Sequence, residues 1–192
     1  MYKCLIFLST VFISCSPSEY KYPHVIIDTR LGEIELELYP DKAPKTVVAF
    51  LHNVDAGLYT NGNFYRVLKA EQSPTDFNTG IIQGGIWQAA DLQQTTLAGI
   101  VHESTQKTGL SHTDGMISMA RKDTGTATTE FFICIGDQST LDFGKAGNSD
   151  GQGYAAFGKV FKGMSIVKKI QSQKSHGENF DEKIDIRSIE RL

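Results

Sequence analysis

The residues best suited to metal chemistry are His102, Glu103, His112 and Asp114. Catalytic zinc sites use closely spaced pairs of ligands on one helix, and none of these residues forms such a pair. Residues 109–113 fall one glycine short of the nucleophile elbow of serine hydrolases, and no predicted strand leads into them. We therefore expect neither a metal site nor a nucleophilic serine in this part of the chain.

Two glycine-containing stretches could hold a phosphate or an ion. Gln83-Gly84-Gly85 ends a predicted strand without the following Lys-Ser/Thr of a phosphate loop, so its glycines indicate close backbone approach or a sharp bend. Residues 137–152 are rich in glycine and acidic residues, but EF-hand spacing would place Phe157 where calcium needs a bidentate Glu. Neither stretch predicts a metal or a cofactor.

The remaining candidates lie on two aromatic strands. In residues 63–68, strand alternation predicts that Phe64 and Arg66 share one face, and the simplest interpretation of Arg66 is a surface arginine over an aromatic ring. In residues 129–135, alternation separates Phe131, Ile133 and Ile135 from Glu130, Phe132 and Cys134. Both faces are largely apolar, so this strand is predicted to be central, with one face closing a core and the other lining a concave site.

The elements that must position these residues are mostly strands. A tight hairpin is predicted between residues 24–29 and 33–39, and later strands follow the same alternation. Apolar residues recur at helical spacing in residues 44–57 and 163–171, with Asp41 available to cap the first helix. This combination implies a mostly antiparallel sheet, and closure into a barrel would remove its edges.

Composition limits the partners. The chain has 192 residues and a formal net charge of −3, without a basic run, so nucleic acid is not an expected partner. The folded part is long enough for one domain with a sizeable core, and we expect a monomer. Cys134 has no partner once the other two cysteines are assigned to the N-terminus, so it is predicted to be a buried small hydrophobe.

The N-terminus has the layout of a secretory signal. Lys3 precedes an apolar run that is too short to span a bilayer, and Ser14-Cys15 follows. This resembles a bacterial lipoprotein signal over residues 1–14, with Cys15 lipidated and residues 15–23 as a polar tether. The protein would then be held in the bacterial cell envelope by its N-terminal lipid only, facing the periplasm or the cell surface. The alternative is an ordinary cleaved signal with an incidental cysteine, since Phe12 stands where the motif usually has Leu.

Five short motifs follow one another along the chain: Phe-Tyr-Arg-Val at 64–67, Gln-Gly-Gly at 83–85, Gly-Met-Ile-Ser-Met-Ala at 115–120, Glu-Phe-Phe-Ile at 130–133 and Phe-Gly-Lys-Val at 157–160. Each motif is weak alone, but in this order and spacing they resemble the cyclophilin family over residues 24–192. The resemblance implies a closed eight-stranded antiparallel barrel capped by two α-helices. It also implies cis–trans isomerisation of X–Pro bonds in proline-containing polypeptides, without metal or cofactor.

The resemblance assigns roles to particular residues. Arg66 matches the family's catalytic arginine, which would donate to the prolyl nitrogen in the twisted state, and Gln83 matches the glutamine that holds it. The other matched positions are predicted to bind substrate: Phe132 as the floor of the proline pocket, Ile81 and Leu141 as its walls, Ala120 and Arg121 through their backbone, and Glu130, Tyr154 and Phe64 around it.

The sequence departs from the family at several of these positions. Gly80 stands where the family has Phe, so a pocket wall is missing unless Phe77 replaces it. The other departures replace the family's usual Gln, Asn, aromatic residue and His by Glu130, Arg121, Thr140 and Tyr154. We expect an active isomerase with altered peptide preference and weak cyclosporin binding.

Glu130 prompts a specific hypothesis. By strand parity it shares a face with Phe132 and could accept a bidentate pair from Arg66. Such a pair would occupy donors needed by the substrate, so Glu130→Gln would raise the rate. The alternative is that Glu130 faces solvent and pairs with nothing.

The predicted function is therefore a peptidyl-prolyl cis-trans isomerase that assists the folding of exported protein clients. The alternative is a lipid-anchored, non-catalytic peptide-binding or chaperone module on the same fold. Arg66 together with Gln83 favours the enzyme, whereas the missing Phe at Gly80 and the charge of Glu130 favour the binder.

Overall fold

A computed structural model describes residues 20–70, 79–87 and 97–192. The predicted signal peptide, the predicted lipidation site Cys15 and the candidate wall residue Phe77 therefore lie outside the described residues. Within the described ranges, no helix is long and apolar enough to cross a membrane.

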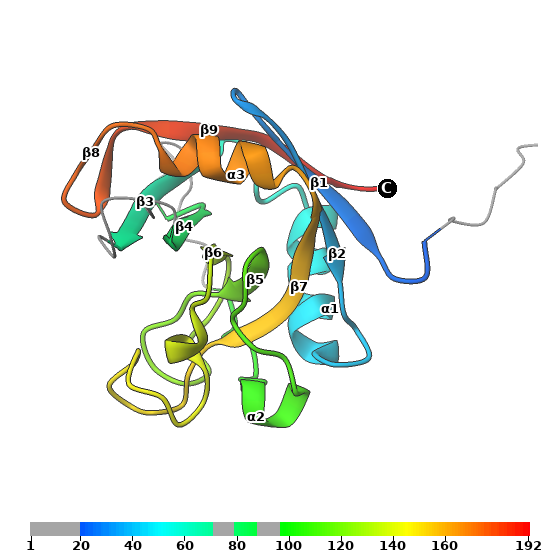
Figure 1. The fold of residues 1–192 in the computed structure, drawn as a ribbon. Helices are drawn as coiled ribbons and strands as arrows, with labels where there is room; N and C mark the ends of the chain where they lie inside the picture. The colour runs from blue at the N-terminus through cyan, green and yellow to red at the C-terminus, as the bar shows by residue number, and fades with distance from the viewer. Residues whose placement is uncertain (1–19, 71–78, 88–96) are drawn as a thin grey trace, which may run out of the picture.

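Eight strands form the closed antiparallel barrel that was predicted. They are β1 (His24–Thr29), β2 (Gly32–Leu38), β3 (Gly62–Ala70), β4 (Thr79–Gly85), β5 (Met116–Met119), β6 (Phe131–Ile135), β7 (Ala155–Lys162) and β9 (Asn179–Arg191). The order around the sheet is β1-β2-β7-β5-β6-β4-β3-β9, and β9 pairs back with β1 to close it. The two-residue strand β8 (Ser175–His176) forms a hairpin with β9 beside β3 (Figure 1).

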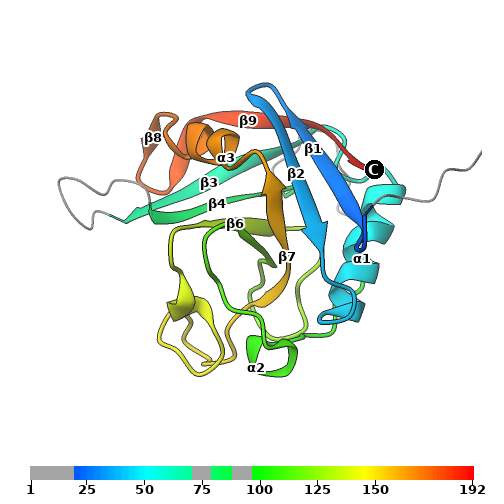
Figure 2. The same ribbon diagram turned by 45° about the vertical axis from the view of Figure 1, so that its right-hand side comes forward.

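Both predicted helices are present. α1 (Pro44–Asp55) and α3 (Met164–Gln171) pack against different parts of the sheet, α1 beside β7 and β9 and α3 against β2, β3 and β4 (Figure 2). Two short helices were not predicted, the one-turn helix α2 (Thr105–Thr108) and the 3-10 helix η1 (Ser139–Leu141). Apolar periodicity needs more than one turn to be visible, so the sequence pattern could not reveal either.

The predicted cap of α1 was wrong. The residue before the helix is Ala43, and Asp41 does not cap it. Instead, Glu103 reaches across from the loop before α2, and its carboxylate accepts hydrogen bonds from the amides of Lys45 (3.2 Å) and Thr46 (2.8 Å). A negative charge at a helix N-terminus is favourable, so Glu103 both stabilises α1 and fixes this loop.

The two faces of β6 confirm the predicted alternation. Phe131, Ile133 and Ile135 point into the main core, whereas Phe132 and Cys134 belong to a second apolar cluster on the outer side. Cys134 is fully buried, as predicted, and burial raises the pKa of its thiol. β6 therefore carries the core on one side and offers an apolar surface on the other.

A β-bulge in β3 corrects the predicted orientation of Phe64. Across β3 and β4, Phe64 pairs with Gly84 and Arg66 pairs with Gln83, so Tyr65 is an extra residue. Phe64 is fully buried in the core, with its ring 5.8 Å from that of Phe131, and it does not share a face with Arg66. An inserted residue reverses side-chain alternation, so the prediction that Phe64 borders the substrate was wrong.

Candidate active site

A pocket of about 220 Å³ lies on the outer side of the sheet, between β3, β4 and β6, the residues that follow β5 and the loop that carries η1. Eight of the predicted site residues line it: Arg66, Ile81, Gln83, Ala120, Arg121, Phe132, Leu141 and Tyr154. Sequence reasoning missed the other lining residues, Leu68, Gln138 and Gly147. Most of the predicted site residues are thus brought to one concave place.

Phe132 forms the apolar floor of this pocket and is held from two sides. The Tyr154 ring stands edge-on to it with centroids 5.3 Å apart, and the His112 ring stacks on it at 5.8 Å. His112 is fully buried, with its Nδ1 2.6 Å from an Asp142 carboxylate oxygen and its Nε2 3.1 Å from the Ser118 hydroxyl. Burial lowers the pKa of His112, although Asp142 opposes that effect. His112 is therefore a structural support behind the floor.

The other residues considered for metal binding also have structural partners. The Nε2 of His102 lies 3.0 Å from the carbonyl oxygen of Gln152, and Asp114 accepts a hydrogen bond of 2.7 Å from the Gly136 amide. Like Glu103 at the start of α1, His102 and Asp114 thus hold together segments that are distant in the sequence.

Arg66 stands at the rim of the pocket in a hydrogen-bonded network. Its Nη1 donates to Gln83 Oε1 at 2.8 Å, and Gln83 Nε2 donates in turn to the Tyr65 hydroxyl at 2.7 Å. Its Nε and Nη2 both donate to Glu178 Oε2, at 2.9 and 2.7 Å. The carboxylate bound to Arg66 is therefore Glu178, which no motif had indicated because it is 112 residues away in the sequence.

Glu130 does not pair with Arg66, and the hypothesis of that pairing was wrong. Its Oε1 accepts hydrogen bonds from the amides of Ile86 (2.8 Å) and Trp87 (2.9 Å), just beyond the end of β4. Glu130 lies directly before β6, at the same edge of the sheet as the end of β4. Its side chain therefore reaches the end of β4 and does not lie along the pocket floor. Burial raises the pKa of Glu130, although its hydrogen bonds oppose that effect.

The second glycine after Gln83 is explained by this contact. Gly85 has φ +149°, and a Cβ there would collide with the Glu130 carboxylate. The predicted close approach is thus confirmed, and what approaches the backbone is a carboxylate of the same chain.

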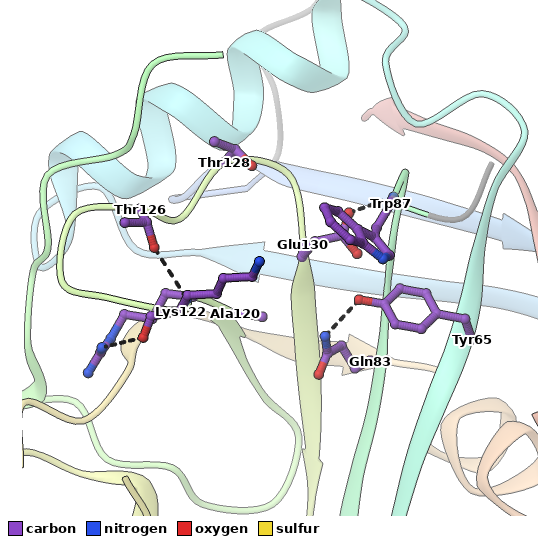
Figure 3. A pocket seen from close by; sticks show the side chains of 9 residues that line it. Tyr65, Gln83, Trp87, Ala120, Lys122, Thr126, Thr128 and Glu130 are labelled. Carbon is purple, nitrogen blue, oxygen red and sulfur yellow. Dashed lines mark hydrogen bonds between the residues drawn. The ribbon is translucent and has the colours of Figure 1, made fainter. Parts of the chain in front are cut away.

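A second, larger pocket of about 390 Å³ adjoins the first and shares Gln83, Ala120 and Arg121 with it. Figure 3 shows its lining, with Tyr65 and Trp87 on one side and Lys122 on the other. Glu130 borders this second pocket rather than the first. Trp87 is 60% exposed, with the Lys122 ammonium 5.4 Å from its ring centre, and sequence reasoning had singled out neither residue.

The Arg121 side chain is held by a neighbouring loop. It is only 1% exposed and forms a bidentate pair with Asp150, with distances of 2.7 and 2.9 Å. The guanidinium carbon also lies 5.3 Å from the centre of the Tyr154 ring. Arg121 and Tyr154, which both depart from the family pattern, therefore contact each other and fix the loop containing Asp150.

The missing wall at Gly80 has a steric reason. Gly80 has φ +135°, and a Cβ at this position would collide with the carbonyl oxygen of Leu68. Leu68 itself lines the pocket from β3. A Phe therefore cannot be placed at Gly80 without moving β3.

Comparison with known proteins identifies the family. The family model described as cyclophilin type peptidyl-prolyl cis-trans isomerase/CLD matches residues 24–191. Peptidyl-prolyl cis-trans isomerase A of Dickeya dadantii (strain 3937) is 36% identical over 148 residues, 77% of this chain and 70% of that protein. Peptidyl-prolyl cis-trans isomerase B of Escherichia coli (strain K12) is 36% identical over 149 residues, 77% of this chain and 83% of that protein.

The fold agrees with these relatives. A cyclophilin type peptidyl-prolyl cis-trans isomerase of Cryptosporidium parvum superposes with a TM-score of 0.69 at 22% identity, covering 89% of this chain and 98% of that one. The chain therefore belongs to the cyclophilin family and is a cyclophilin-type peptidyl-prolyl cis-trans isomerase.

Proposed function

We propose that the X–Pro bond is rotated over Phe132, with the proline ring seated in the smaller pocket. The support is the apolar floor of Phe132 flanked by Ile81 and Leu141, within a space of about 220 Å³. Burial of a small apolar ring in this pocket is favourable. The prolyl nitrogen carries no N–H, so burial leaves no donor of the ring without a hydrogen-bond partner.

Arg66 is the proposed electrophile. Rotation about an X–Pro bond is slow because the nitrogen lone pair is delocalised into the carbonyl, with a barrier of ~20 kcal/mol. In the twisted state the lone pair is localised on nitrogen and can accept a hydrogen bond. A donor that meets this developing acceptor stabilises the transition state more than the substrate and therefore accelerates rotation.

The single observation that carries this proposal is the bond of 2.8 Å between Arg66 Nη1 and Gln83 Oε1 at the pocket rim. It holds the guanidinium beside the floor where the prolyl nitrogen would lie. No nucleophile or proton transfer is required for this chemistry, in keeping with the structural roles of His112 and Glu103.

The two adjoining pockets support an extended substrate. They share Gln83, Ala120 and Arg121, so a chain with proline in the smaller pocket has a neighbouring residue close to the larger one. The larger pocket, lined by Trp87, Lys122 and Glu130, then determines which neighbouring substrate residue is preferred.

The test of this function is NMR exchange spectroscopy on short peptides with one X–Pro bond. With the purified full chain at substoichiometric concentration, we expect cis and trans signals to exchange much faster than in peptide alone. Peptides with X as Ala, Phe, Lys and Glu would measure the preference. Unaltered exchange for all four peptides would contradict catalysis and favour a purely binding role.

We further propose that the enzyme is a monomeric lipoprotein of the cell envelope that assists the folding of exported proteins. The support is the predicted signal over residues 1–14 followed by Cys15. Slow X–Pro isomerisation can limit folding, so exported clients would benefit from catalysis at the membrane surface.

Expression of the full chain in a bacterium tests this location. Cys15→Ala should release the protein from the membrane fraction or leave the signal uncleaved, whereas the control Cys4→Ala, within the signal, should remain anchored. A Cys15→Ala protein that is still processed and membrane-bound would end this proposal.

A further inference from the structure

Glu178 binds the outer edge of the Arg66 guanidinium from a hairpin turn. It lies between β8 and β9, next to Gly177, whose φ of +57° makes the tight turn possible. One oxygen, Oε2, accepts from both Nε (2.9 Å) and Nη2 (2.7 Å) of Arg66. This is a charge-assisted contact with two donors, which constrains orientation as well as distance.

The backbone holds this carboxylate in place. The carbonyl oxygen of Glu178 accepts a hydrogen bond of 2.8 Å from the amide of Val67, the residue that follows Arg66 in β3. The other side of the hairpin is tied to the same strand, since Lys69 Nζ donates to the Gln173 carbonyl (2.9 Å) and the Ser175 hydroxyl (3.0 Å). The hairpin therefore runs along the segment of β3 that carries Arg66.

The geometry determines which donors of Arg66 stay available. A guanidinium has five N–H groups. Glu178 takes those on Nε and Nη2 along one edge, and Gln83 takes one on Nη1. One N–H remains on each terminal nitrogen, so the two partners together fix where the remaining donors point.

We infer that Glu178 is a positioning residue for catalysis, which orients the Arg66 fork toward the prolyl nitrogen. This inference rests on the proposed role of Arg66. Both side chains are partly exposed, 34% for Arg66 and 57% for Glu178, so the pair contributes little to overall stability. Its effect should appear in the transition state, where donor direction matters, rather than in substrate binding.

The test compares Glu178→Ala and Glu178→Gln with the parent chain. Glu178→Ala should lower kcat about five- to tenfold with KM nearly unchanged, less than the ~10²–10³-fold typical of losing a donor outright. Glu178→Gln should recover most of the rate, because its amide oxygen can still accept from the same edge. Thermal unfolding should not change appreciably for either variant.

Glu182→Ala is the matched control. Glu182 lies on β9, four residues after Glu178, and is 81% exposed, but it pairs with Arg30 at 3.2 Å. Its substitution removes the same charge as Glu178→Ala. It should leave kcat unchanged. An equal loss in Glu182→Ala and Glu178→Ala would show a general effect of charge and would overturn the inference.

Two further readouts separate positioning from other effects. The ¹⁵Nε–¹Hε signal of Arg66 should shift and exchange faster with water in Glu178→Ala, and in an Arg66→Ala background the Glu178 substitution should have no further effect on rate. A higher kcat in Glu178→Ala would mean that the Glu178 carboxylate weakens Arg66 as a donor, and it would overturn the inference. An active parent with unchanged kcat in Glu178→Ala contradicts this inference alone, whereas an inactive parent contradicts the proposed function as well.

Discussion

At the scale of single residues, a chain of hydrogen bonds runs from Glu178 through Arg66 and Gln83 to Tyr65. Arg66 donates to Gln83, and Gln83 donates to the Tyr65 hydroxyl. The hydroxyl therefore fixes which end of the Gln83 amide faces Arg66. We expect these neighbouring residues to influence catalysis without contacting the reacting atoms.

Tyr65→Phe tests this chain. It removes the acceptor for Gln83 Nε2, a bond worth ~1 kcal/mol, so kcat/KM should fall about fivefold. The control Tyr22→Phe removes another tyrosine hydroxyl, one bound to Asp41 away from the site, and should leave the rate unchanged. Equal rates for Tyr65→Phe and the parent would show that Gln83 needs no such support.

Glu130 gives a prediction about stability and pH. Burial raises its pKa in the folded protein above that of the unfolded chain, so the folded state holds the proton more tightly. The associated stability is present at acidic pH and is lost as pH rises from ~4.5 through the raised pKa. Glu130→Gln removes this loss.

The difference in thermal midpoint between Glu130→Gln and the parent should therefore grow in favour of the variant between about pH 4.5 and pH 8. Other carboxylates titrate identically in both proteins and cancel in the difference. A difference that does not depend on pH, or that grows in favour of the parent, would contradict a buried carboxylate at this position.

At the level of elements, the outer face of β6 depends on the loop that follows it. Asp142, directly after η1, binds His112, and His112 supports Phe132 and the Ser118 hydroxyl of β5. The loop, two strands and the pocket floor are thus joined through one buried ring.

His112→Ala should destabilise the protein by ~2–4 kcal/mol, because it leaves a cavity behind Phe132 and a buried hydroxyl without its partner. Urea unfolding would measure the change. The control His52→Ala, at an exposed position of α1, should cost less than ~0.5 kcal/mol. A loss for His112→Ala as small as for this control would exclude the supporting role.

The same elements show what the sequence could reveal. Strands with regular alternation, such as β2 and β6, and helices with a full apolar stripe, such as α1 and α3, were predictable because burial of one face is visible as a period. The bulge at Tyr65 was not, since one extra residue leaves composition unchanged and still reverses the faces of Phe64 and Arg66. Motif resemblance located Arg66, Gln83 and Phe132 despite this error.

Contacts between segments that are distant in the sequence were the second feature that the sequence could not predict. Glu178 on Arg66 and Glu103 on α1 depend on where a hairpin and a loop come to lie, which no local pattern encodes. Glu130 was predicted to border the proline pocket, but it lines the adjoining larger pocket. Its partners are backbone amides beyond β4, whereas a prediction from side-chain charge favoured Arg66. Charges in a sequence suggest pairs, whereas the fold decides which pairs form.

For the whole molecule, closure of the barrel by β1 and β9 leaves no free edge among the eight barrel strands and holds both pockets on rigid strands. Strands β3, β4 and β6 line the smaller pocket, while Leu141, Gly147 and Tyr154 from the segments that connect the strands lie at its margin. Substitutions at the margin should therefore alter peptide preference, and the rate of rotation should depend on the strand residues.

The central claim is that Arg66 supplies the donor that accelerates rotation, and steady-state kinetics of its variants test it most directly. Arg66→Ala should lower kcat/KM by ~10²–10³, equivalent to ~3–4 kcal/mol, with little change in thermal midpoint. Arg66→Lys should also be slow, because an ammonium lacks the planar fork. Arg30→Ala, a surface arginine paired with Glu182, is the control and should match the parent. Near-parental kcat/KM in both Arg66 variants would contradict the account.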